Sequence, residues 1–167
     1  MTFMDEAIFL LEPILKHGWF LKGSKPSCPV NWSRGKECVF GALSFGNGGK
    51  LISKQAKKIN SENFIEYVQC LLDKNGSQVL FVDNAPWHTS YKTSGFLEEV
   101  RDCIEPMYLP PYSPELNPVE PGWKVVRSKL ANRLFENTSE LRESLGKALD
   151  EVQLNINEQR YLTGQIS

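Results

Sequence analysis

One segment in the middle of the chain limits its fold more than any other. Four apolar residues at positions 79–82 end abruptly at Asp83, and a turn-forming stretch that includes Pro86 follows at once. A short apolar run bounded by turn formers predicts a strand that is buried on both faces, as in a parallel sheet. Ligands of such sheets bind beyond the carboxyl ends of the strands. We therefore expect Asp83 to lie at the functional edge of a sheet.

The chain of 167 residues is long enough for one compact domain with a substantial core, and we expect a single domain over residues 1–167. Its apolar runs are only a few residues long, far short of a membrane span, and the N-terminus lacks the features of a secretory signal. These observations predict a cytoplasmic protein that does not act in a membrane.

Charge is distributed unevenly along the chain, although the net charge is only −1. Between positions 16 and 58 the one acid is Glu37. The same segment holds nine basic residues: Lys16, Lys22, Lys25, Arg34, Lys36, Lys50, Lys54, Lys57 and Lys58. Segregation of this kind favours a polyanionic partner on one face, but a run of lysines can equally be a solvated surface.

The first third of the chain predicts an antiparallel meander. Residues 2–10 alternate as a strand, which places Asp5 and Glu6 on opposite faces. The other strands of this part are expected at residues 19–21, at 37–45 and, after a glycine-rich turn at 46–49, at 50–53.

The middle of the chain alternates helices and strands, which implies parallel pairing beside the meander. The expected elements are a helix from residue 61 to a stop at Gly76, the strand at 79–82, a shorter helix around 96–100 and a strand at 104–109. Pro106 interrupts the last strand and places it near an edge of the sheet, because proline cannot donate to a strand ladder.

The segment 110–120 is too rich in proline for regular structure and predicts a rigid, largely extended loop. Asn117 is expected to cap a helix with Pro118 at its first position. The apolar stripe of this helix is Val119, Trp123, Val126, Leu130 and Leu134. A capping box of Asn137 and Glu140 predicts a last helix. Its stripe is Leu141, Leu145, Ala148, Val152 and Ile156.

Three acids occupy positions suited to chemistry: Asp5 in the first strand, Asp83 after the central strand and Glu120 in the first turn of a helix. Adjacent parallel strands would bring the aspartates together, and the helix would add Glu120. Such carboxylates suit a pair of Mg²⁺ or Mn²⁺ ions, which supports in-line phosphoryl displacement. Each acid also has an ordinary interpretation, as a surface residue, a turn former and the capping partner of Asn117 respectively. Glu115 is a rival for the third position.

Two motifs resemble the catalytic domain of mariner-superfamily insertion-sequence transposases. They are VDNAPWH at 82–88 and LPPYSPELNPVE at 109–120, and the segments FMDEA at 3–7 and GWFLKG at 18–23 are similar to the family's opening strand and hairpin. The resemblance covers about residues 3–135.

This resemblance implies an RNase H-like α/β fold, with a mixed five-stranded sheet of meander and parallel strands flanked by helices. It implies that Asp5, Asp83 and Glu120 are the catalytic, metal-binding DDE triad. It also favours Glu120 over Glu115, because the family's glutamate is the one in Asn-Pro-x-Glu.

Two departures from the family pattern stand out. Family members usually carry helix-turn-helix DNA-binding domains before the catalytic domain, whereas this chain begins almost at the first strand, so we expect a catalytic half. Pro121 and Gly122 directly follow Glu120 and are expected to distort the start of its helix.

Further residues are expected to support the site or to bind DNA. Asn84 and His88 follow Asp83 closely enough to line the same pocket, although a histidine there can also be a packing residue. Trp19 and Trp32 could stack on unpaired bases, but a core position for Trp19 and a loop anchor for Trp32 are favoured. The residues expected to contact DNA are Lys22, Lys25, Arg34, Lys36, Lys124 and Arg127.

Together with the resemblance, these features predict a transposase catalytic domain that cuts and joins DNA with Mg²⁺ or Mn²⁺ in a two-metal site. Its expected partners are transposon ends and target DNA, in the nucleoid. A homodimer and a separate helix-turn-helix subunit are left open. The alternatives are an RNase H-like nuclease that only hydrolyses and a non-catalytic, transposase-derived fragment that binds DNA.

Overall fold

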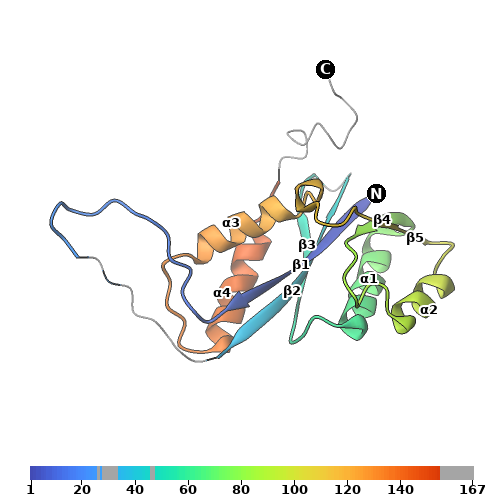
Figure 1. The fold of residues 1–167 in the computed structure, drawn as a ribbon, viewed down its shortest axis with the longest axis horizontal. Helices are drawn as coiled ribbons and strands as arrows, with labels where there is room; N and C mark the ends of the chain where they lie inside the picture. Colours follow the sequence, from blue (N-terminus) through green and yellow to red (C-terminus); the bar gives the residue numbers. More distant parts are fainter. Residues whose placement is uncertain (26, 28–33, 46–47, 155–167) are drawn as a thin grey trace, which may run out of the picture.

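A computed structural model describes residues 1–25, 27, 34–45 and 48–154, and it shows a five-stranded sheet with helices on both faces (Figure 1). The strands, in the order β3-β2-β1-β4-β5, are β1 (Thr2–Leu10), β2 (Lys36–Ser44), β3 (Leu51–Ala56), β4 (Gln78–Val82) and β5 (Ile104–Tyr108). The helices are α1 (Ser61–Asn75), α2 (Tyr91–Glu99), the short 3-10 helix η1 (Pro114–Leu116), α3 (Glu120–Leu130) and α4 (Thr138–Asp150).

The sheet is mixed, as the sequence predicts. β1, β2 and β3 form an antiparallel meander, while β4 pairs parallel with β1 and β5 pairs parallel with β4. β5, the strand that contains Pro106, lies at an edge of the sheet. In this order the first strand of the chain lies at the centre of the sheet, beside the strand that ends at Asp83.

Each face of the sheet has its own apolar core, and β1 contributes to both. Phe3 and Phe9 belong to the core that the sheet shares with α3 and α4, whereas Met4 belongs to the core on the side of α1 and α2. Because side chains alternate along a strand, this packing fixes Asp5 on the α3 side and Glu6 on the α1 side.

The predicted start of α1 near Ser61 and its stop at Gly76 are confirmed. Asn60 caps α1 by accepting a hydrogen bond from the backbone N–H of Asn63 at 3.0 Å. Gly76 ends the helix with a φ of 66°, a conformation that favours glycine.

The cap of α4 is confirmed as well. Asn137 accepts a hydrogen bond from the N–H of Glu140 at 3.0 Å. Val152 of the predicted stripe is buried just past the end of α4, and Ile156 lies outside the described residues.

The prediction of a strand at residues 19–21 is wrong. β1 pairs directly with β2, so the sheet offers these residues no strand to pair with. Trp19 is fully exposed, which overturns its interpretation as a core residue. The chain after β1 extends away from the sheet and past α3 (Figure 1). Lys16 Nζ in this part donates to Ser128 Oγ at 2.7 Å. Trp32 and positions 46–47 of the predicted turn lie outside the described residues.

None of the helices in the described ranges combines the length and apolar character that a membrane crossing requires.

Candidate active site

The register between β1 and β4 places the two aspartates side by side. Phe3 of β1 pairs with Phe81 of β4, and their rings are stacked with centroids 4.4 Å apart. Asp5 and Asp83 each follow two residues later along parallel strands. They therefore lie side by side at the point where β4 ends, as the sequence predicts.

Glu120 is brought to this edge by the proline-rich loop. The buried Asn117 fastens the end of the loop to β1, because its Nδ2 donates to the carbonyl oxygen of Met4 at 3.0 Å. Its Oδ1 accepts the N–H of Val119 at 3.1 Å. The amide nitrogen and the amide oxygen of Asn117 are thus both hydrogen-bonded to backbone, the nitrogen to the residue before Asp5. Glu120 follows as the first residue of α3.

The prediction that Asn117 is the N-cap of this helix is therefore wrong. The capping position is Val119, and no side chain caps the helix. The Asn117–Glu120 capping box is absent for the same reason. Pro121 sits in the first turn of α3, where a helix does not need its missing N–H, and α3 begins at Glu120. The helix ends at Leu130, and Leu134 of the predicted stripe is 39% exposed.

Asp5, Asp83 and Glu120 line one cavity of about 460 Å³. Its other walls are Asn84, Ala85, Asn117 and the proline loop from Leu109 to Pro114. Glu115 instead lines a neighbouring hollow with Lys124, and Glu120 lies between the two. The structure thus brings the three predicted acids together in one cavity, whereas Glu115 lies outside that cavity and shares a hollow with Glu120 alone of the three.

Asp5 is the most perturbed acid of the three. Burial raises its pKa from the ordinary value of 3.8 to about 7, and the negative charges of Glu6 and Glu120 add to this effect. A hydrogen bond opposes it, because Trp123 Nε1 donates to Asp5 Oδ2 at 2.8 Å. The ionised form of Asp5 is therefore unfavourable until a cation or proton compensates it.

A glycine makes room for the Trp123 contact. Gly41 of β2 pairs with Asp5 across the sheet, and a Cβ at this position would meet the Trp123 ring at 2.4 Å. The ring is buried and cannot move aside freely. Gly41 thus leaves room for the indole to approach the sheet closely and to reach Asp5.

Gly41→Ala is expected to lower the free energy of unfolding by about 1–3 kcal/mol through overpacking, measured by urea denaturation, and to displace the Trp123 indole, measured by tryptophan fluorescence. Gly95→Ala in α2 is the matched control. Nothing lies within 4 Å of a Cβ there, so alanine should raise helix stability by about 0.5–1 kcal/mol. Equal effects of the two substitutions would contradict this account of Gly41.

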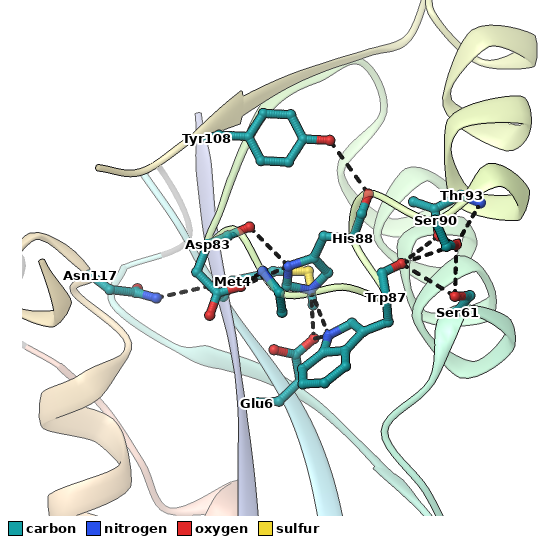
Figure 2. Close-up of polar contacts among 11 residues, drawn as sticks. Met4, Glu6, Ser61, Asp83, Trp87, His88, Ser90, Thr93, Tyr108 and Asn117 are labelled. Carbon is teal, nitrogen blue, oxygen red and sulfur yellow. Dashed lines mark hydrogen bonds and ion pairs between the residues drawn. The ribbon is translucent and has the colours of Figure 1, made fainter. Parts of the chain in front are cut away.

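Asp83 is held on its far side by His88. The Oδ1 atom of Asp83 lies 2.8 Å from His88 Nδ1 and accepts the N–H of Ala85 at 3.0 Å (Figure 2). The hydrogen bond from His88 lowers the pKa of Asp83, so this acid is ionised where Asp5 is not. Burial alone lowers the pKa of His88, but its bonds to Asp83 and Glu6 outweigh burial and raise it to about 9.

Asn84, the other predicted supporting residue, lies in the cavity wall. Its Nδ2 donates to the carbonyl oxygen of Leu109 at 2.7 Å, which ties the turn after β4 to the first residue of the proline loop. Asn84 therefore supports the shape of the cavity.

Three residues of the site were not predicted as such: Glu6, Trp123 and Tyr112. Trp123 fits the apolar stripe of α3, and only its indole N–H hints at a polar partner. Glu6 is visible in the sequence as an acid on a buried strand. Tyr112 lines the cavity with a fully exposed side chain and a φ of 57°, unusual for an aromatic residue.

The basic residues predicted to contact DNA fall into two groups. Lys22, Lys25, Arg34 and Lys36 are exposed and lie on or beside the segment between β1 and β2. Lys124 lines the hollow beside Glu120. Arg127 places its guanidinium over the Phe9 ring, 5.2 Å from the centroid.

The donor set of the cavity fits Mg²⁺ or Mn²⁺. Its three carboxylates are hard oxygen ligands, and burial together with the negative charges of Glu6 and Glu120 raises the pKa of Asp5, so a cation beside Asp5 would favour its ionised form. Over the described part of the chain, no group of three or more acid, histidine or cysteine side chains is arranged so that it could hold a metal ion by itself. Mg²⁺ usually takes one or two carboxylates from the protein and keeps several water ligands, so it does not require a cage of three or more side chains.

Several solved structures share this fold. The pre-cleavage Mos1 transpososome gives a TM-score of 0.70 at 16% identity, over 91% of this chain and 48% of that chain. The Mos1 mariner paired-end complex with Mn gives 0.69 at 17% identity, with the same coverage. The HTLV-2 integrase catalytic core domain in complex with magnesium gives 0.55 at 16% identity, over 89% and 81% of the two chains. The RNase H-like fold is thereby confirmed, and the chain spans about half the length of these Mos1 chains.

Sequence comparisons point the same way. The uncharacterized protein y4pE/y4sA of Sinorhizobium fredii (strain NBRC 101917 / NGR234) is 33% identical over 106 residues, which are 62% of this chain and 75% of that protein. Residues 1–142 match the family model described as DDE superfamily endonuclease. The chain therefore belongs to the DDE superfamily endonuclease family.

Proposed function

We propose that this chain is the catalytic domain of a transposase, which cuts and joins DNA by phosphoryl transfer dependent on a divalent metal. The observation that carries the proposal is the meeting of Asp5, Asp83 and Glu120 in one cavity at the carboxyl edge of parallel strands. Family membership supports the same chemistry.

In this proposal Asp5, Asp83 and Glu120 hold two Mg²⁺ or Mn²⁺ ions. When bound, such ions stabilise the attacking and leaving oxygens of an in-line displacement. Trp123 orients Asp5 through Oδ2, and His88 orients Asp83 through Oδ1. A water molecule first attacks the scissile phosphate and releases a 3′-hydroxyl at the transposon end. That hydroxyl then attacks a phosphate of the target DNA and displaces a second 3′-hydroxyl.

DNA phosphates are proposed to contact the basic residues of two parts of the chain. Lys22, Lys25, Arg34 and Lys36 would contact the backbone from the segment between β1 and β2, and Lys124 and Arg127 from α3. Contacts of this type give affinity that is independent of sequence and falls steeply with salt.

Recognition of transposon ends needs side chains that reach base edges, commonly from a recognition helix. We propose that a helix-turn-helix module, on this chain or on a separate subunit, supplies it. The Mos1 structures are a paired-end complex and a pre-cleavage transpososome. By analogy, a homodimer acting on DNA in the nucleoid is the proposed assembly.

A comparison of two glutamates tests the proposal. Glu120→Gln keeps the shape of the side chain but removes the charge that a metal ligand needs, so nicking of supercoiled plasmid in Mn²⁺ should fall by more than about 100-fold, beyond the loss typical of an outer-shell partner. Glu115→Gln, in the neighbouring hollow, is the matched control and should retain most of the activity. The reverse order of damage would overturn the assignment of Glu120.

Strand joining separates transposition from plain hydrolysis. A labelled duplex with a free 3′-hydroxyl end should become covalently linked to plasmid DNA in the presence of the wild-type chain and Mn²⁺. Nicking without any joined product would favour the nuclease that only hydrolyses. Neither product from the wild-type chain would favour the non-catalytic fragment.

A further inference from the structure

A buried acid lies directly behind the candidate active site. Glu6 follows Asp5 in β1, and its side chain is only 5% exposed. It faces the opposite side of the sheet from Asp5, so it does not enter the cavity lined by the three site acids. A carboxylate that is removed from water needs partners that compensate its charge.

Two ring nitrogens supply those partners. His88 Nε2 lies 2.9 Å from Glu6 Oε1, and Trp87 Nε1 donates to the same oxygen at 3.2 Å (Figure 2). Trp87 Nε1 also lies 3.0 Å from His88 Nε2. A carboxylate oxygen can accept two hydrogen bonds, so Glu6 Oε1 can accept from both rings when His88 Nε2 carries a proton.

His88 has no freedom to turn away from these contacts. It is 1% exposed, and its ring packs against Phe64 with centroids 4.6 Å apart. The other ring nitrogen, Nδ1, faces Asp83 Oδ1 at 2.8 Å and the carbonyl oxygen of Asp83 at 3.1 Å. A rotation of the imidazole would break its contacts with both acids at once.

The turn at residues 83–90, which carries His88, is itself held by hydrogen bonds to neighbouring elements. The carbonyl oxygen of Trp87 accepts the hydroxyl of Thr93 at 2.6 Å, and Ser61 Oγ lies 2.8 Å from Ser90 Oγ, which joins α1 to the start of α2 (Figure 2). The backbone N–H of His88 donates to Ala85 at 2.9 Å. His88 therefore lies in a turn that is hydrogen-bonded within itself and to the starts of α1 and α2.

We propose that Glu6 is a positioning residue, which acts through His88 to fix the orientation of the Asp83 carboxylate from the opposite face of the sheet. The Asp83 side chain is 55% exposed and would otherwise sample several rotamers at the end of β4. Holding Oδ1 in one place sets the carboxylate plane before a ligand arrives, and preorganisation of this kind strengthens binding. The inference rests on the proposed function, in which Asp83 is a metal ligand.

A double-mutant cycle on Mn²⁺ affinity, measured by calorimetry, tests the inference. Glu6→Met keeps the length of the side chain and removes the carboxylate, and it should weaken Mn²⁺ binding by about 10–100-fold, the loss typical of an outer-shell partner. In the background of His88→Asn, which breaks the bridge, the same substitution should have little further effect. Glu6→Gln keeps an acceptor oxygen for His88 and should restore most of the affinity.

Glu66→Gln is the matched control, because Glu66 pairs with Lys54 on the surface and should leave Mn²⁺ affinity unchanged. If Glu6→Met does not fold, as judged by thermal melting, Glu6→Leu replaces it in the cycle. Additive losses from Glu6→Met and His88→Asn would overturn the inference, since they would mean that Glu6 does not act through His88. A wild-type chain that binds no Mn²⁺ would instead overturn the proposed function and, with it, this role of Glu6.

Discussion

Asp83→Ala is expected to abolish Mn²⁺ binding and plasmid nicking together, with a loss of more than about 100-fold in each, because an inner ligand should cost more than an outer-shell partner. The hydrogen bond from His88 lowers the pKa of Asp83, whereas the pKa of Asp5 is raised to about 7. Asp83 therefore carries a full negative charge at neutral pH, whereas Asp5 is still partly protonated there. The loss of Asp83 removes a charged ligand for a cation.

Asp102→Ala is the control for this prediction, because Asp102 is exposed after α2 and does not line the cavity. Calorimetry measures Mn²⁺ binding, and thermal melting shows whether each variant is folded. Undiminished Mn²⁺ affinity in a folded Asp83→Ala variant would rule out Asp83 as a ligand.

The centre of the fold is predictable from sequence because local pattern and tertiary environment agree there. Both faces of the sheet are covered, so the alternation in residues 2–10 assigns Phe3 and Met4 to different cores and separates Asp5 from Glu6. The abrupt end of the apolar run at Val82 marks the edge where Asp83 lies. Parallel pairing then brings the two aspartates together without any long-range information beyond the order of the elements.

The failed predictions share a cause, which is that a local pattern does not identify its partner. Residues 19–21 have the composition of a strand, but β1 pairs with β2 and leaves them without a neighbour. Asn117 is a residue type that favours helix caps, but its side-chain amide donates a hydrogen bond to the carbonyl oxygen of Met4, 113 residues away in sequence. The Glu6–His88 contact spans 82 residues and likewise has no local signal.

The raised pKa of Asp5 leads to a prediction about stability that does not depend on catalysis. In the unfolded chain Asp5 releases its proton near the ordinary value of 3.8, whereas in the folded protein it holds the proton up to its pKa of about 7. Between these pH values the folded state binds more protons than the unfolded state, so this residue lowers the free energy of unfolding as pH rises.

Asp5→Asn removes this loss of unfolding free energy. In EDTA the Tm of the variant should therefore exceed that of the wild type, and the difference in Tm should grow from pH 4 to pH 7 and then stay constant. The gain is on the order of 1 kcal/mol per pH unit at most, and each kcal/mol corresponds to about 2–4 °C in Tm for a domain of this size. Asp102→Asn, at an exposed aspartate, should show no such growth with pH. A margin that is the same at pH 4 and pH 8 would contradict the raised pKa of Asp5.

Addition of Mn²⁺ at pH 8 should reverse the order of the two melting temperatures. A ligand that binds only the folded state raises its stability in proportion to the logarithm of its concentration over Kd. The wild type gains this stabilisation by binding Mn²⁺ through the ionised Asp5, whereas the asparagine variant has lost the charge that attracts the ion. Asp5 would thus lower the stability of the metal-free fold because its burial, beside Glu6 and Glu120, is what prepares it to bind a cation. If Mn²⁺ raised both melting temperatures equally, Asp5 would be a buried acid without a part in metal binding.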